Sequence, residues 1–207
     1  MLHKRSFASL VVASVLSACG SSPPANDPDS GPIVLTDSGP AACAPPVEPF
    51  GTQEGRNMRP FTLNRCDGTP YEFYGDAEGF CDASFTVLTM AAGWCAPCRL
   101  ETEQLEAELT QGYADRGVRV VQAVIQDNDY AAPDAAFCQG WVDEYGLTNA
   151  VVLDPTQVTQ IYFPAGSLPA TLIVDSRGVI RHREYGTSTG LRTIRAALDE
   201  LLASEGL

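Results

Sequence analysis

The sequence is poor in basic residues and nearly lacks lysine. Its 207 residues include 13 Lys or Arg against 26 Asp or Glu, so the formal net charge is −13, and the only lysine is Lys4. A surface with this charge repels phosphate backbones and anionic headgroups. We therefore expect no nucleic-acid partner, and solubility is the simplest role for the acidic residues.

No hydrophobic run is long enough to span a bilayer as a stable helix. The run at 7–16 is short, follows the basic residues 3–5, and ends in Leu16-Ser17-Ala18-Cys19-Gly20. This pattern predicts a bacterial lipoprotein signal peptide over 1–18, with Cys19 acylated as the first residue of the mature chain. An ordinary signal peptide is the alternative. Because Gly20 and Ser21 carry no acidic retention signal, we expect a lipid anchor in the cell envelope, facing the periplasm, with the outer membrane favoured.

The mature chain divides into a tether and one domain. Residues 19–46 are rich in Ser, Pro, Gly, Asp and Ala and lack apolar periodicity, which predicts a flexible tether. Residues 47–207 alternate apolar runs with turn signals and suit one domain of ordinary size. We expect strands at 61–65, 71–74, 85–91, 118–125, 151–153, 171–174 and 179–183, and helices at 100–113, 135–145, 156–162 and 191–202.

Two cysteines in Trp94-Cys95-Ala96-Pro97-Cys98 stand between an expected buried strand and an expected helix. Unpaired backbone N–H groups and the helix dipole at such a position favour the thiolate of Cys95, which we expect to face solvent. A thiolate attacks disulfides, and Cys98 can then resolve the mixed disulfide that forms. The motif therefore predicts a redox-active Cys95–Cys98 pair, with a purely structural disulfide as the alternative.

Neither a zinc site nor a c-type haem fits this motif. Zinc would need a second pair of ligands, and the only histidines are His3 and His182. A c-type haem would need a histidine where Arg99 follows the second cysteine. We therefore expect no metal and no cofactor.

Seven cysteines indicate an oxidising compartment. Apart from Cys19 and the redox pair, they are Cys43, Cys66, Cys81 and Cys138. Three complete pairings of these four are possible. Cys66 with Cys81 is favoured because the two bracket one predicted hairpin and close a loop of about 15 residues, and a bridge of that size stabilises by about 3 kcal/mol. Cys43 would then pair with Cys138, although either could remain a free thiol.

The order of elements is that of an α/β, thioredoxin-like fold with an N-terminal β-hairpin and a central insertion. Four motifs mark it: Phe61-Thr62-Leu63 with Asp67-Gly68, Gly93-Trp94-Cys95-Ala96-Pro97-Cys98-Arg99, Leu168-Pro169-Ala170-Thr171, and Val174-Asp175-Ser176-Arg177-Gly178. Together they resemble the TlpA/ResA-like thiol-disulfide oxidoreductases of the thioredoxin superfamily, over about residues 58–205.

The resemblance implies roles for individual residues. Cys95 would be the nucleophile and Cys98 the resolving thiol, while Pro169 would be a cis-proline packed beside them. The implied substrate contacts are Trp94, which shields the disulfide, Pro97, which sets the turn, and Leu168, whose backbone is left free to pair with substrate.

The family often carries a Glu at the position of Glu101, one helical turn after Cys98. Glu101 would relay protons to that thiol, or it is a solvated acid on the helix surface. The chain also departs from the pattern of its relatives. Thr89 stands where thioredoxins have a buried Asp, and Met90-Ala91-Ala92-Gly93 replaces the usual Phe-Trp-Ala type of sequence.

The function implied is disulfide exchange with extracytoplasmic protein thiols or disulfides, mainly as a reductant recharged by a membrane electron donor. A thiol peroxidase is one alternative, although Ala92 stands where such enzymes place a Thr three residues before the reactive Cys. A non-enzymatic binding module is the other, although copper-delivering relatives use CxxxC and a distal His.

Overall fold

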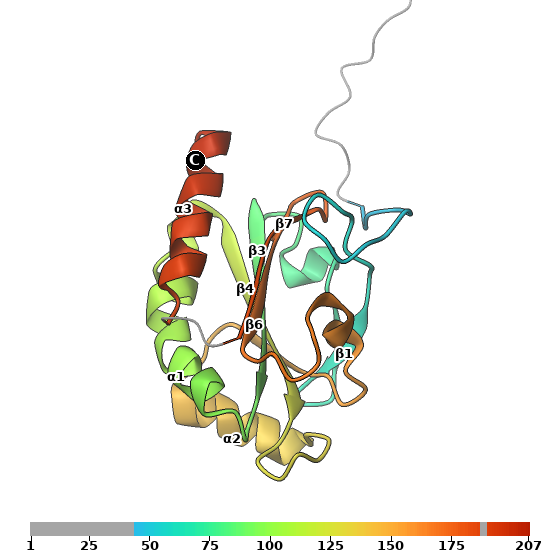
Figure 1. Cartoon of the computed structure of the whole chain (residues 1–207), viewed down its shortest axis with the longest axis vertical. Coiled ribbons are helices and arrows are strands. Elements are labelled where there is room, and N and C mark those ends of the chain that lie inside the picture. The colour runs from blue at the N-terminus through green and yellow to red at the C-terminus, as the bar shows by residue number, and fades with distance from the viewer. Residues whose placement is uncertain (1–43, 187–189) are drawn as a thin grey trace, which may run out of the picture. The chain divides into compact units, whose positions relative to one another are not determined.

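The computed structural model describes residues 44–186 and 190–207. Its centre is a seven-stranded mixed sheet with strand order β2-β1-β5-β4-β3-β6-β7 (Figure 1). The strands are β1 (Thr62–Arg65), β2 (Pro70–Glu72), β3 (Phe85–Ala92), β4 (Val118–Gln126), β5 (Ala150–Leu153), β6 (Ala170–Asp175) and β7 (Ile180–Tyr185). The α/β class and the thioredoxin-like order expected from the sequence are confirmed.

Helices lie to one side of the sheet and short helical turns complete the connections (Figure 1). The α-helices are α1 (Ala96–Leu105), α2 (Ala135–Tyr145) and α3 (Arg192–Glu205). The short elements are η1 (Asp76–Glu78), the π-helical η2 (Glu106–Gln111), η3 (Ala114–Arg116) and η4 (Val158–Tyr162). Across the described ranges, no helix combines the length and hydrophobicity needed to cross a membrane.

The central strands β3 and β4 direct the chain to the cysteine motif. They are parallel, with Phe85 opposite Val118, and β6 pairs antiparallel with the other edge of β3. Every residue of β3 is buried, as expected for a continuous apolar run covered on both faces. Because β3 and β4 run in the same direction, both end at one edge of the sheet, and the cysteine motif begins there.

The N-terminal hairpin forms as predicted and is fixed by its turn. The side chain of Asp67 accepts hydrogen bonds from the Thr69 N–H at 2.9 Å and the Thr69 hydroxyl at 2.6 Å, and Gly68 has φ +82°. An Asp that binds the backbone two residues on, followed by Gly in the left-handed region, is a strong turn signal. On its other edge β1 pairs antiparallel with β5, so the hairpin extends the main sheet.

The predicted pairing of Cys66 with Cys81 is wrong. Cys66 is bonded to Cys138, across a sequence separation of 72 and a Cα–Cα distance of 5.2 Å. The Cys66–Cys138 bond also contradicts the predicted pairing of Cys43 with Cys138. Cys81 is disulfide-bonded as well. In the hairpin register Asn64 faces Pro70, so Cys66 sits in the turn and Cys81 lies well beyond the end of β2.

Tertiary packing supplies the correct partner instead. β1 pairs with β5, and α2 packs against β5, which brings the start of α2 to the hairpin turn. The signal peptide over 1–18, Cys19, Cys43 and most of the tether over 19–46 lie outside the described residues, and their assignments stay predictions.

The helix expected at 100–113 starts earlier and changes type. Pro97 occupies the first turn of α1, where its missing N–H and fixed φ suit a helix start. The inward face of α1 carries Cys98, Glu101, Thr102 and Leu105, whereas Leu100 points outward and is 59% exposed. Apolar periodicity could not predict this buried face, because it includes the polar residues Glu101 and Thr102.

Candidate active site

The approach to the cysteines depends on a glycine that sequence reasoning did not single out. The N–H of Gly93 donates to the Gln126 carbonyl at 2.9 Å, which continues the β3–β4 pairing past the end of β3. A Cβ on Gly93 would lie 2.6 Å from Asn128 Oδ1 and 2.7 Å from the Phe137 ring. Only glycine therefore lets the chain pass this close to the loop after β4.

Cys95 and Cys98 form the expected disulfide at the N-terminus of α1, with a Cα–Cα distance of 5.2 Å. Cys95 is the N-cap residue of α1, and its Sγ accepts a hydrogen bond from the Cys98 N–H at 3.2 Å. This donor and the helix N-terminus both stabilise negative charge on the Cys95 sulfur.

Both cysteines are buried in this disulfide form. Cys95 is 3% exposed and Cys98 is 1% exposed. The expectation that the first sulfur faces solvent is therefore wrong for the oxidised protein, because the residue at the cap is packed into the core cluster. A substrate must therefore approach the Cys95 sulfur past the residues that surround it.

Arg99 binds the cysteine motif to its surroundings, a role that its position in the sequence does not indicate. Its guanidinium donates to the Gly93 carbonyl at 2.8 Å and to Asn128 Oδ1 at 2.6 Å. It also donates to Glu144 Oε1 at 3.2 Å and the Tyr145 hydroxyl at 3.1 Å, both on α2. Burial raises the pKa of Tyr145, so its hydroxyl stays protonated beside the arginine. Arg99 therefore fixes α1, α2 and the loop after β4 to one another.

A small cavity lies behind the disulfide. Among its lining residues are Thr89, Cys98, Glu101, Gln122 and Pro169. Glu101 is 8% exposed, so it is a buried group beside Cys98 and not a solvated acid on the helix surface. The Thr89 hydroxyl is buried and has no hydrogen-bond partner among the described residues. A buried polar atom in a cavity is a typical place for an ordered water.

Hydrogen bonds hold the wall of this cavity in place. Gln122, on β4, donates to the Thr102 hydroxyl at 3.0 Å and accepts from the Trp141 indole at 2.8 Å. The Thr102 hydroxyl in turn donates to the Cys98 carbonyl at 2.8 Å. All of these groups are buried, so the chain of bonds fixes α1 against β4 and α2.

The Leu168–Pro169 peptide bond is cis, as the resemblance implied. Pro169 lines the cavity next to Cys98, and its carbonyl accepts from the Gly186 N–H at 2.9 Å. Leu168 is 8% exposed. The structure therefore brings Cys95, Cys98, Glu101 and Pro169 together at one edge of the sheet.

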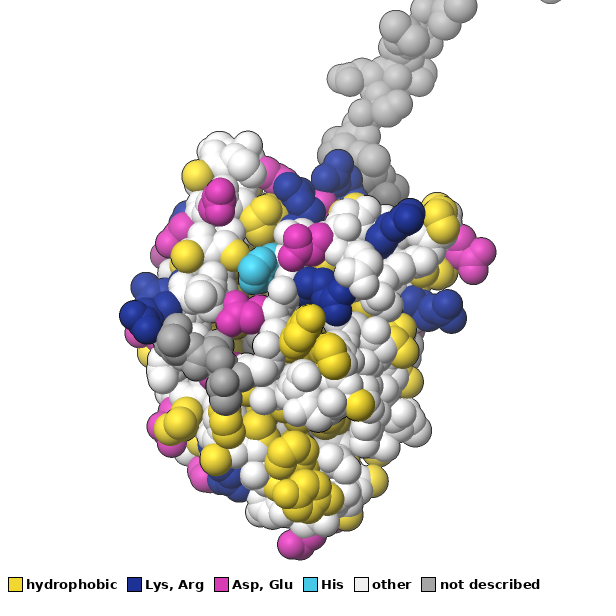
Figure 2. Space-filling model, viewed as in Figure 1, with side chains coloured by type: hydrophobic (Ala, Val, Ile, Leu, Met, Phe, Trp, Pro, Cys, Tyr) yellow, Lys and Arg dark blue, Asp and Glu magenta, His cyan; other side chains and the backbone are white. Residues whose placement is uncertain are grey.

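Trp94 contributes an aromatic rim. Its ring stacks on Tyr130 with centroids 4.8 Å apart and planes at 16°, and its indole N–H donates to Gln126 Oε1 at 3.0 Å. Tyr130 lies in the loop after β4 and is 63% exposed. Apolar side chains gather on the surface at this end of the molecule, where α2 and the loop after β4 lie (Figure 2).

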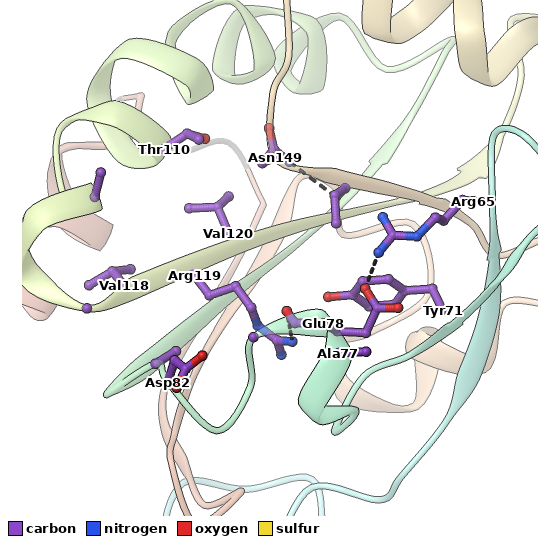
Figure 3. Close-up of a pocket in the computed structure, with 15 residues that line it drawn as sticks. Arg65, Tyr71, Ala77, Glu78, Asp82, Thr110, Val118, Arg119, Val120 and Asn149 are labelled. Carbon is purple, nitrogen blue, oxygen red and sulfur yellow. Dashed lines mark hydrogen bonds and ion pairs between the residues drawn. The ribbon is translucent and has the colours of Figure 1, made fainter.

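A larger cavity, of about 520 Å³, lies at the start of β4, away from the cysteines (Figure 3). Three of its four charged residues already bond other groups: Arg65 pairs with Glu78, and Arg119 donates to the carbonyls of Phe73 at 2.8 Å and Glu78 at 3.1 Å. The candidate active site therefore rests on the chemistry of the cysteines and not on the size of a pocket.

Comparison with known proteins identifies a family that this chain matches. A profile of the Redoxin family matches residues 53–201. The thioredoxin-like protein YneN of Bacillus subtilis is 31% identical over 140 residues, which is 67% of this chain and 75% of that protein. The thiol-disulfide oxidoreductase ResA of Bacillus anthracis is 27% identical over 96 residues, 46% of this chain and 51% of ResA.

The solved structures agree on the fold. The crystal structure of a secreted thiol-disulfide isomerase from Corynebacterium glutamicum aligns with a TM-score of 0.57 and 21% identity. The alignment covers 72% of this chain and 86% of that one. The chain spans about half the length of several other curated relatives that it matches.

Proposed function

The chain belongs to the Redoxin family and is a thiol-disulfide oxidoreductase of the thioredoxin superfamily, and we propose that it reduces disulfides of extracytoplasmic proteins through Cys95 and Cys98. The observation that carries this proposal is the placement of Cys95. Its sulfur caps α1 and accepts the Cys98 N–H at 3.2 Å, in a position that favours a thiolate.

The exchange has two steps. The Cys95 thiolate attacks one sulfur of the substrate disulfide, a mixed disulfide forms, and the other substrate sulfur leaves as a thiolate that takes up a proton. Cys98 then loses its proton and attacks Cys95 Sγ, which releases the second substrate thiolate. The substrate gains two electrons, and Cys95 and Cys98 become the disulfide seen in the structure. A dithiol donor must then reduce this disulfide by the same chemistry in reverse.

Glu101 is proposed to accept the proton of Cys98 during the second step. Its carboxylate and the Cys98 thiol line the same cavity, and the unpartnered Thr89 hydroxyl lies on that cavity too. One water held by Thr89 would connect carboxylate and thiol. Cys98 is 1% exposed in the disulfide form, and a Cys98 thiol that keeps this packing would have no direct contact with bulk solvent.

Replacing Glu101 by Gln is expected to slow turnover about a hundredfold at neutral pH, the lower end of what a positioned acid or base contributes. The mixed disulfide should accumulate, because only the resolving step loses its proton acceptor, and the rate should recover as pH rises. Quenched reactions analysed by mass spectrometry measure the fraction held as mixed disulfide. Glu103→Gln, an exposed neighbour on α1, is the matched control. Equal turnover and equal pH profiles in the two variants would remove Glu101 from the mechanism.

The envelope location is part of the same proposal. It rests on the signal pattern before Cys19, and the names of the ResA and DsbE relatives describe thiol-disulfide chemistry without giving a compartment. The lipid anchor at Cys19 would hold the domain near a membrane electron donor that supplies the dithiol. Mass spectrometry of the mature N-terminal peptide tests the anchor, and an unmodified or absent Cys19 would reject it.

The direction of electron flow is proposed to be reductive. A Cys95–Cys98 potential near −270 mV, the thioredoxin value, is expected, whereas a value near −120 mV is that of a strong oxidant. Equilibration with glutathione buffers of known potential measures it.

A Cys98→Ser variant is expected to trap substrates. Without the resolving thiol, Cys95 remains joined to its partner, so reducible adducts with extracytoplasmic proteins should appear in non-reducing gels of cell envelopes. The double variant Cys95→Ser/Cys98→Ser is the control, because it keeps the surface and loses the nucleophile. No adducts above this control would reject the exchange role. Faster turnover of hydrogen peroxide than of any protein disulfide would favour a thiol peroxidase instead.

A further inference from the structure

Tyr130, which stacks on Trp94 beside the cysteine motif, has two features that cost free energy in a folded protein. Its side chain is 63% exposed, and its backbone has φ +63°, in the left-handed region that residues with a bulky side chain rarely adopt. Residues held in such conformations occur where the surrounding structure enforces them and are concentrated at functional sites. The observation calls for a reason why the chain keeps an exposed aromatic ring here.

The loop after β4 is built to hold this conformation. Asp127 Oδ1 accepts hydrogen bonds from the N–H groups of Asp129 at 2.8 Å and Ala131 at 2.9 Å. The Asp127 N–H donates to the Ala131 carbonyl at 3.0 Å, which closes the loop. The Gln126 side chain donates to the Tyr130 carbonyl at 2.8 Å. The backbone on both sides of Tyr130 is therefore fixed by polar contacts.

The same glutamine positions the ring next to the cysteine motif. Gln126 Oε1 accepts the indole N–H of Trp94 at 3.0 Å, while its amide nitrogen holds the Tyr130 backbone. The two rings stack at 4.8 Å and 16°, so one face of Tyr130 is covered by Trp94. Its exposed fraction shows that much of the rest of the ring is open to solvent. Trp94 directly precedes Cys95, so the open ring surface borders the path to the nucleophile.

We propose that Tyr130 is a specificity-determining residue that stacks with an aromatic side chain next to the reactive cysteine of the substrate. The inference rests on the proposed function and leaves its exchange steps unchanged. An open, flat ring matches a second ring better than a charged group, and Ala131 and Ala132, which follow Tyr130 in the same loop, are exposed as well. The partner is thus a polypeptide segment in which an aromatic residue is next in sequence to the reactive cysteine.

The test compares two peptide disulfides, the homodisulfides of N-acetyl-Cys-Phe-amide and N-acetyl-Cys-Gly-amide. The pre-reduced protein is mixed with each, and the second-order rate constant of Cys95–Cys98 oxidation is measured. The wild type should prefer the Phe peptide about threefold to tenfold, the range for one aromatic pair. Tyr130→Phe should keep this ratio and Tyr130→Gly should reduce it to about one. Leu207→Ala should keep it, since it removes an exposed apolar residue at the other end of the molecule (Figure 1).

Glycine is the informative substitution because it suits φ +63° without strain. If Tyr130 only supported the loop, Tyr130→Gly would lower the melting temperature and slow both peptides equally, which would overturn the proposal. A wild-type ratio near one would also overturn it while leaving the exchange function intact. If the reduced wild type reacts with neither peptide, the proposed function itself fails.

Discussion

Replacing Cys95 by Ser is expected to abolish disulfide reduction, with a loss of at least about 1,000-fold in turnover. A serine hydroxyl is not ionised at neutral pH and cannot form the mixed disulfide through which the electrons pass. Cys98 is not expected to take over, because it lies inside the first turn of α1, whereas Cys95 is the residue that caps the helix. Reduction of a protein disulfide by the pre-reduced variant, followed by thiol quantification, measures the effect.

Serine is chosen because it should leave the fold intact. The Cys95 side chain accepts the Cys98 N–H as the N-cap of α1, and serine is among the preferred residues at that position. The melting temperature of the variant should therefore match that of the reduced wild type. Turnover above about 1% of wild type in a correctly folded variant would mean that another thiol carries the reaction.

The parts of the fold that could be predicted are those specified by local sequence. Val118–Gln126 and Phe85–Ala92 are apolar runs with turns on either side, and both became central strands within a residue or two of the expected bounds. Asp67 and Gly68 specify a turn by themselves, and the hairpin around them formed. Helix 135–145 was also bounded correctly, since Asp134 caps its N-terminus and Gly146 ends it at φ +61°.

The parts that could not be predicted depend on residues distant in sequence. Glu101 remained ambiguous because three further acidic residues follow it, and only its position over the cavity shows that it is buried. Arg99 bonds partners 29 to 46 residues away, and no local pattern marks it. The burial of Cys95 has the same origin, because it depends on the tertiary packing of the core cluster to which this residue belongs.

Gly93 and Tyr130 are functional-site residues for which the sequence contains only a weak indication. A glycine directly before the Trp-Cys pair is compatible with a simple strand end, and its tight contacts with Asn128 and Phe137 become visible only in three dimensions. Tyr130 lies in a polar loop, where an isolated aromatic residue is unusual. Such a residue between Asp and Ala positions could have been noted as a candidate for surface recognition.

Removing the Cys66–Cys138 disulfide is expected to lower the free energy of unfolding by about 4 kcal/mol, the chain-entropy value for closing a loop of this length. The bridge spans 72 residues, whereas the pairing favoured by the sequence would have closed only the hairpin. It joins the hairpin turn to α2, so its loss frees the unfolded chain over β3, α1 and β4. Urea unfolding of Cys66→Ala/Cys138→Ala against wild type, both with Cys95–Cys98 oxidised, measures the difference.

The connectivity itself can be read from peptides, because trypsin has few sites in this lysine-poor chain. Cleavage at Arg65, Arg99, Arg119 and Arg177 places Cys66 and Cys81 in one peptide and Cys138 in another. A non-reduced digest should therefore contain peptide 66–99 linked by a disulfide to peptide 120–177. After a second cleavage at Glu72, peptide 120–177 should remain linked to the fragment that contains Cys66. A link within residues 66–99 between Cys66 and Cys81, or a loss of stability below about 1 kcal/mol, would contradict the assignment. The double variant should still oxidise and reduce Cys95–Cys98 at the wild-type potential, because the structural bridge supports the fold and takes no part in the exchange.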